Sequence, residues 1–390
     1  QVTAIDRFYF GAELTSAYAK EGRFSSRTLD IRDLGPETFA GMDAVIDLAA
    51  LSNDPAADID LKLTDEINCK GRFNVASAAR SAGVARFVMA SSCAVYGFST
   101  ATALTEESAL NPQTAYARSM VAAEQRAFGL ATDGFVVSAL RQATIFGLSP
   151  RMRFDLVVNT MVKSAFETGK IVVTSGGSQY RPLLHVRDTA RAFLRTLAMP
   201  AGDVQGQVFN VGFDNYRIKD LATVVRDALP IPVEVEFLSQ VSDHRSYNVS
   251  FEKAKRVLGF VAEHDVRFGA LEVYTALAEN RVDCGERTIT AWSMPGSWRL
   301  STKEPWPVIR RGSSRRLIDV PRTAVAMTLA PLRCALERQS SGGKRQKVKG
   351  QSLRVQPFTF CLSPFTSPNR RPGPGQPWRS ASSRRRPGRT

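Results

Sequence analysis

One stretch, Ser91-Ser92-Cys93-Ala94-Val95-Tyr96-Gly97, closes an apolar run from residue 86 that is typical of a buried strand. Its serines therefore lie at the strand's carboxyl end, where open parallel α/β sheets bind their ligands. Tyr116 follows in the first turn of a predicted helix that Asn111-Pro112 introduces. A serine and a tyrosine at one sheet edge form an acid/base pair for a substrate hydroxyl or ketone. Taken singly, Ser92 is better explained as a strand end and Tyr116 as a packed helix start, but the full string and its order after a strand favour function.

The pattern around this stretch predicts the fold class. Apolar runs at residues 2–5, 44–50, 86–91 and 135–140 are interleaved with helical patterns at 66–82, 112–130 and 154–168. Strands that alternate with helices are typical of an α/β, doubly wound parallel sheet. After residue 200 we predict short strands at 208–211 and 232–237 and helices at 218–229 and 251–258. These form a smaller α+β lobe that covers the binding edge of the sheet.

The net charge of +15 is the sum of two segments that differ in composition. Residues 285–390 hold 22 Lys and Arg and four Asp and Glu, so they carry +18, while residues 1–284 carry −3. This last segment is rich in Pro, Arg and Ser and lacks the apolar surface to offset ordering entropy, so we predict a disordered tail. Translation through a frameshift explains it best, and a basic arm for RNA or membranes is the alternative. The tail has no regular aromatic-basic pattern, which disfavours nucleic acid as a partner.

Cysteine usage and apolar run length narrow the cellular setting. The five cysteines are scattered, without the spacing of a metal site or a disulfide framework, so we predict no metal and a reducing, cytoplasmic location. The longest apolar run, residues 44–51, is too short to cross a bilayer and contains Asp47, so we predict no membrane association.

Further motifs agree in order with the first. They are Leu29-Asp30-Ile31-Arg32-Asp33, Val45-Ile46-Asp47-Leu48-Ala49-Ala50, Asn68 with Gly71, the stretch from Leu140 to Gly147, the stretch from Arg181 to Asp188, and His244-Arg245 with Leu258-Gly259-Phe260. Together with the Ser-Ser-x-x-Val-Tyr-Gly string and Tyr116, they resemble the extended short-chain dehydrogenases, the NAD-dependent epimerase/dehydratase family. The resemblance covers residues 1–290 and implies a Rossmann-type sheet.

The resemblance implies NAD as cofactor and a nucleotide-diphosphate sugar as substrate. It implies catalytic roles for Tyr116, Ser92 and Ser91, cofactor contacts from Asp6, Asp30, Ile31, Leu48, Ala49, Ala50, Asn68, Tyr116 and Gln142, and substrate contacts from Ser92, Arg181 and Arg245. A carboxylate at Asp6 favours NAD over NADP because it repels a 2′-phosphate, although Arg7 follows directly. Family members are often dimers, which here implies a homodimer through helices at 66–82 and 112–130. Those helices equally suit a role that only covers the sheet.

The resemblance also divides the chain. Residues 1–147 resemble an NAD-binding Rossmann domain without its first strand and glycine-rich loop, and residues 183–212 return to it. Residues 148–182 and 213–284 form the substrate lobe. The missing strand would be central in the sheet and its loop would hold the pyrophosphate, so this implies impaired cofactor binding.

Two positions depart from the family's pattern. Met120 stands where a lysine usually follows the catalytic tyrosine by four residues, which predicts a weakened base. Cys93-Ala94 stands where 4,6-dehydratases carry an Asp-Glu pair, which favours epimerisation or simple oxidation and reduction over loss of water. We therefore predict an NAD-dependent nucleotide-sugar epimerase or oxidoreductase, impaired or intact. The alternatives are a non-catalytic nucleotide-binding relative, a decayed fragment, and a basic-tailed nucleic-acid binder.

Overall fold

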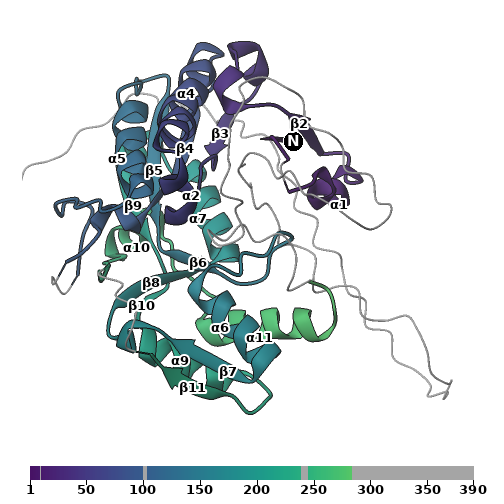
Figure 1. Ribbon diagram of the computed structural model, residues 1–390. Coiled ribbons are helices and arrows are strands. Elements are labelled where there is room, and N and C mark those ends of the chain that lie inside the picture. The colour runs from purple at the N-terminus through teal and green to yellow at the C-terminus, as the bar shows by residue number, and fades with distance from the viewer. Residues whose placement is uncertain (9, 100–102, 239–244, 283–390) are drawn as a thin grey trace, which may run out of the picture. The chain divides into compact units, whose positions relative to one another are not determined.

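The computed structural model describes residues 1–8, 10–99, 103–238 and 245–282 (Figure 1). The predictions for the basic tail at 285–390 lie outside these residues. Within the described part of the chain, no helix is both long and apolar enough to span a bilayer.

The main sheet has four parallel strands, which confirms the predicted α/β class. Their order is β3 (Ala44–Asp47), β4 (Arg86–Ser92), β5 (Val136–Gln142) and β9 (Gln207–Val211). Strands β4 and β5 are apolar on both faces because each face is covered, as is usual for parallel sheets. Phe87, Met89 and Val137 point into one core cluster, and Val88 and Leu140 point into another.

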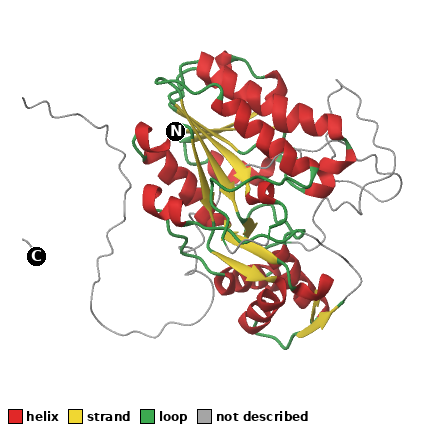
Figure 2. Ribbon diagram, turned by 90° about the vertical axis from the view of Figure 1, so that its left-hand side faces the viewer, coloured by secondary structure: helices red, strands yellow, loops and turns green. Residues whose placement is uncertain are grey.

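Helices cover both faces of this sheet (Figure 2). One face packs against α4 (Arg72–Ser81) and α5 (Ala115–Phe128), and the other packs against α7 (Val186–Ala198) and α10 (Glu252–Leu258). The helix predicted at 66–82 begins instead with a π-helical segment, η4 (Asp65–Gly71), and continues as α4. In this segment, the buried Asn68 side chain accepts a hydrogen bond from the Leu51 amide and donates to the Leu51 carbonyl and to Ser119 Oγ.

Strands β1 (Val2–Asp6) and β2 (Phe24–Thr28) pair in parallel as a separate two-stranded sheet. Among the described residues, β1 pairs only with β2 and β3 pairs only with β4, so the two parallel sheets share no ladder. The further strand expected at the centre of the doubly wound sheet stays a prediction.

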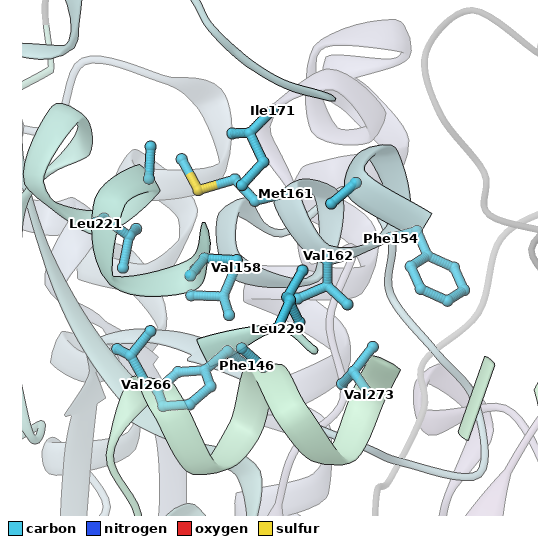
Figure 3. Packing of buried hydrophobic residues seen from close by; sticks show 14 of the residues in the cluster. Phe146, Phe154, Val158, Met161, Val162, Ile171, Leu221, Leu229, Val266 and Val273 are labelled. Carbon is cyan, nitrogen blue, oxygen red and sulfur yellow. The ribbon is translucent and has the colours of Figure 1, made fainter. Parts of the chain in front are cut away.

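The smaller lobe has its own core (Figure 3). Phe146, Val162 and Leu221 meet there, with Val266 and Val273 from the last described helix. The lobe contains β6 (Thr144–Phe146), β8 (Tyr180–His185) and β10 (Asp214–Arg217) in one sheet, β7 (Lys170–Val173) paired with β11 (Glu234–Phe237), and helices α6 (Val157–Thr168), α9 (Ile218–Ala228) and α11 (Val266–Ala278).

Short elements make up most of the connections. They are η1 (Ala12–Thr15), α1 (Ser16–Ala19), η2 (Ile31–Asp33), η3 (Pro36–Phe39), α2 (Asp54–Ile59), α3 (Leu61–Thr64), η5 (Cys93–Tyr96), η6 (Ser175–Gly177) and α8 (Ala201–Val204). Three of them, η2, α2 and η5, follow β2, β3 and β4, so they lie at the carboxyl ends of these strands, where a site is expected.

Candidate active site

A cavity of about 850 Å³ opens at the carboxyl ends of β3, β4 and β5. Its wall on the sheet side comes from these strand ends and from the start of α5, and its opposite wall comes from loops and strands of the smaller lobe. The sheet wall includes Leu48, Ala50, Arg72, Ser91, Ser92, Tyr116, Met120 and Gln142, and the lobe wall includes Arg151, Arg153, Asp155, Arg181, Arg245 and Tyr247.

Local structure at two element ends brings Ser92 and Tyr116 together. Ser92 is the last residue of β4, and its Oγ accepts a hydrogen bond from the Ala94 amide at 3.1 Å. Tyr116 lies in the first turn of α5, which begins after the Thr114 cap, whose Oγ1 accepts from the Ala117 amide at 3.1 Å. Both side chains line the cavity, where the Ser92 hydroxyl acts on the pKa of Tyr116.

Opposing influences act on the Tyr116 hydroxyl. Burial is the largest and raises the pKa of Tyr116 above its usual value. The hydrogen bond with Ser92 lowers this pKa, as do the positive charges of Arg72 and Arg153, whereas the Asp54 carboxylate raises it. The residue therefore requires nearby cations if it is to act as a base near neutral pH.

The two predicted substrate arginines both line the lobe wall. Arg181, on β8, donates from Nη1 to the carbonyl oxygens of Tyr180 at 2.8 Å and Arg245 at 2.5 Å. Arg245 forms an ion pair with Asp54, whose carboxylate also accepts from Thr114 Oγ1 at 2.6 Å. The main chain of Arg245 thus holds Arg181, while its own side chain reaches across to α2.

The predicted cofactor residues fall into two groups. Leu48, Ala50 and Gln142 line the cavity with Tyr116. Ser91 lies beside them, 2% exposed, and its Oγ has no hydrogen-bond partner among the described residues. This buried, unsatisfied hydroxyl next to an apolar surface fits a flat ring that carries a polar substituent, as the nicotinamide of NAD does.

Five predicted cofactor residues lie outside the cavity lining, and two of them, Asp6 and Asp30, lie next to β1 and β2. Asp6 ends β1, and its Oδ1 accepts from the Phe8 amide at 2.7 Å. Asp30 caps η2 and forms ion pairs with Arg7 and Arg32, each at 2.6 Å. Burial opposes ionisation of Asp30, but hydrogen bonds from the two arginines prevail and lower its pKa to about 2.

Ile31, Ala49 and Asn68 are the remaining predicted cofactor residues. Ile31 packs so closely against Gly71 that a Cβ atom there would lie 2.9 Å from Ile31 Cδ1. Ala49 is buried in the turn after β3. Asn68 is fully buried, and its side chain hydrogen-bonds both the amide and the carbonyl of Leu51, at 2.7 and 3.2 Å. In this structure Asn68 ties the turn after β3 to α5 and does not line the cavity.

Sequence reasoning missed three arginines of the cavity, Arg72, Arg151 and Arg153. Arg153 forms a bidentate pair with Asp155, at 2.5 and 3.1 Å, and donates to Ser52 Oγ at 3.2 Å. Arg72 is buried against Asp47, with Nε 2.7 Å from Oδ2. Asp47 was the sequence signal for a buried arginine such as Arg72, because a carboxylate within an apolar run requires a buried counter-charge.

Comparison with known proteins agrees with this geometry. The NAD dependent epimerase/dehydratase family matches residues 1–212. A dTDP-glucose 4,6-dehydratase of Streptomyces griseus is 26% identical over 301 residues, which cover 75% of this chain and 90% of the relative. A UDP-glucose 4-epimerase of Corynebacterium glutamicum is 26% identical over 288 residues, which cover 67% and 84%.

Solved structures share the fold. MoeE5 in complex with UDP-glucose and NAD has a TM-score of 0.62 at 22% identity, and the match covers 72% of this chain and all of that one. The dTDP-glucose 4,6-dehydratase DesIV of Streptomyces venezuelae, with NAD and TYD bound, has a TM-score of 0.63 at 24% identity, with 72% and 88% covered. At these identities the similarity establishes the Rossmann-type architecture.

Proposed function

This chain belongs to the NAD dependent epimerase/dehydratase family, and we propose that it is a nucleotide-sugar epimerase or oxidoreductase. The observation that carries the proposal is the placement of Tyr116 and Ser92 together in the lining of a cavity at the carboxyl edge of a parallel sheet. Arginines on the opposite wall, Arg181 and Arg245, complete a site that suits a sugar joined to a diphosphate.

NAD supplies the hydride chemistry when bound, because its nicotinamide ring accepts and returns a hydride. Leu48, Ala50 and Gln142 are proposed to hold the nicotinamide end, with the Ser91 hydroxyl as a hydrogen-bonding partner. Ala49, in the turn after β3, and Asn68, which bonds Leu51 of that turn from η4, are proposed to support this end.

The adenosine end is assigned to Asp6, Asp30 and Ile31. The ion pair of Arg7 with Asp30 supports NAD over NADP, because it engages the cation that would otherwise favour a 2′-phosphate.

The protein's own side chains transfer the proton and orient the reacting sugar oxygen. Tyr116, in its ionised form, takes the proton of the sugar hydroxyl that is oxidised and returns it when the ketone is reduced. Ser92 orients that oxygen through its own hydroxyl. Arg181 and Arg245 bind the diphosphate, and Arg245 exchanges the Asp54 carboxylate for phosphate oxygens as the substrate enters.

The carboxylates of the cavity favour epimerisation or redox chemistry over loss of water. Asp54 and Asp155 line the cavity, and each is ion-paired with an arginine. The residues after Ser92 are Cys93 and Ala94, which offer no carboxylate for an elimination. We therefore place this protein with the epimerases and oxidoreductases of its family.

We also propose a division of the chain into two parts. Residues 1–147 and 183–212 are proposed to form the NAD-binding domain, and residues 148–182 and 213–284 are proposed to form the substrate lobe. The separate lobe core of α6, α9 and α11 supports this division, and Phe146 and Leu183, from the edges of the NAD-binding segments, also pack into that core.

The test uses the full chain with NAD and a panel of UDP- and dTDP-hexoses. We expect NAD binding by calorimetry and sugar conversion by chromatography, with conversion reduced roughly 10²- to 10⁴-fold in Tyr116→Phe. Tyr274→Phe is the matched control, because Tyr274 packs against Phe166 in the lobe and lies outside the cavity lining. NAD binding without any conversion would instead indicate a non-catalytic relative, and equal activity of the two variants would overturn the role of Tyr116.

A further inference from the structure

We propose that Arg72, at the start of α4, supplies the positive charge that stabilises the ionised form of Tyr116. This inference deepens the proposed function and rests on it. It makes Arg72 a positioning residue that acts on the substrate through Tyr116, and it gives Asp47 the role of holding that cation in place.

The location of Arg72 is fixed by four contacts deep in the molecule, one of them a 3.4 Å hydrogen bond from Nη2 to the Asp47 carbonyl. Its side chain is 2% exposed. Nε donates to Asp47 Oδ2 at 2.7 Å, Nη2 donates to the Ala90 carbonyl at 2.6 Å, and Nη1 lies 3.3 Å from the sulfur of Met120. The guanidinium therefore sits where β3, β4 and α5 meet, and it forms part of the cavity wall.

Met120 connects this cation to Tyr116. Residues four apart lie on the same face of a helix, so the Met120 sulfur marks a position one turn along α5 from Tyr116. A thioether is a weak hydrogen-bond acceptor and carries no charge. Nη1 therefore faces this position without a strong partner there. It brings a full positive charge to the face of α5 that carries Tyr116 and Met120, whereas Arg118 of the same turn is exposed and donates to the Gln113 carbonyl.

Of the cations that lower the pKa of Tyr116, Arg72 is the one best placed to stabilise the phenolate. Arg153 also lowers the pKa of Tyr116, but it forms a bidentate pair with Asp155 and is partly exposed. Asp54, which raises this pKa, is engaged by Arg245. Arg72 touches only one carboxylate oxygen, through Nε, and its burial protects its field from screening by salt.

A purely structural role for Arg72 makes different predictions. A buried ion pair joins two elements whatever lies in the cavity beside it, and loss of either partner then destabilises the protein in the same way. An electrostatic role has a sign: removal of the cation disfavours the phenolate of Tyr116, whereas removal of the anion favours it. The test therefore compares Arg72→Gln with Asp47→Asn.

The readout is the phenolate absorbance of Tyr116, which needs neither cofactor nor turnover. Each variant is titrated as the full chain, and the same variant carrying Tyr116→Phe is subtracted to isolate this residue. We expect the midpoint of Tyr116 to move to higher pH in Arg72→Gln and to lower pH in Asp47→Asn. Midpoints that stay in place, or that move in the same direction, overturn the inference.

Two further variants keep the test informative if a single variant unfolds. Arg72→Gln combined with Asp47→Asn leaves a neutral amide pair, so no buried charge lacks a partner. Arg72→Gln combined with Met120→Lys returns a cation to the same helix turn, and we expect it to bring the midpoint back towards that of the unaltered protein. A midpoint in this rescue variant no lower than in the neutral pair contradicts the inference.

Turnover then separates this inference from the proposed function. If the protein is active, Arg72→Gln is expected to lose roughly 10- to 100-fold in kcat/KM at neutral pH and to recover as the pH rises. Loss of activity in Tyr116→Phe with unmoved midpoints in the Arg72 variants refutes only the role of Arg72. Shifted midpoints in a protein that converts no sugar refute the proposed reaction and leave the electrostatic coupling established.

Discussion

The two walls of the cavity hold their charges in different ways. On the sheet wall, the side chains of Arg72 and Asp47 are 2% and 1% exposed. Between the lobe wall and α2, the side chains of Arg245 and Asp54 are 40% and 20% exposed. A buried pair keeps one geometry because its partners have no water to exchange with, whereas a half-exposed pair is readily replaced by another anion. The sheet wall thus suits fixed chemistry, and the lobe wall suits a substrate that comes and goes.

The largest effect that tests this comparison is on stability. Asp47→Ala leaves the Arg72 charge buried without its carboxylate, and we expect a loss of about 3–5 kcal/mol in the free energy of unfolding. Arg245→Ala removes a half-exposed cation, and we expect a loss of about 1 kcal/mol or less. Urea unfolding of the two variants measures both values. Equal losses would mean that the two walls do not differ in the proposed way.

A smaller effect concerns the lobe wall and substrate affinity. Arg181→Ala is expected to raise KM for a nucleotide-diphosphate sugar with little change in kcat, because a diphosphate contact serves the bound substrate and the transition state alike. Loss of one hydrogen-bonded charge contact corresponds to about 1.5–3 kcal/mol. Arg217→Ala is the matched control, since Arg217 lies on the neighbouring strand β10, bonds Tyr180, and does not line the cavity. A fall in kcat at unchanged KM would assign Arg181 to the chemistry instead.

The sheet wall could be predicted from sequence because its signals are local. A continuous apolar run predicts a strand covered on both faces, and the hydroxyls at its end must then lie at the carboxyl edge. The apolar run before Ser92 and the Asn111-Pro112 helix start before Tyr116 were sufficient to place both residues on one edge. The structure has the predicted strands within one or two residues of their expected bounds, except for the run at 44–50, where β3 ends at Asp47.

The rest of the site depends on contacts between segments far apart in sequence. Arg72 and Asp47 are 25 residues apart, and nothing in the helical pattern at 66–82 distinguishes a buried arginine from an exposed one. Arg153 meets Ser52, 101 residues away, through a loop that has no regular pattern. Helix α11 was also missed, because its apolar residues are spread around it and show no clear stripe. Tertiary packing supplies what local patterns leave open.

The smallest effect sharpens the comparison, because it concerns an ion pair next to β1 and β2 that is only partly buried. Asp30 has its pKa lowered to about 2 by hydrogen bonds from Arg32 and Arg7 that outweigh its burial, and Arg7 is 39% exposed. Because the folded pKa lies below the usual 3.8, this carboxylate stabilises the fold above pH 4, and that contribution disappears as the pH falls towards 2.

Screening by solvent reduces the contribution of Asp30 to about 1–2 kcal/mol. We expect Asp30→Asn to lower the free energy of unfolding by this amount at pH 6 and to match the unaltered protein near pH 2, as measured by urea unfolding across that range. A constant difference at every pH would show that the amide disturbs packing instead. A loss smaller than that of Asp47→Ala would show that burial of the ion pair, and not its position on the sheet side of the molecule, decides how firmly a charge is held.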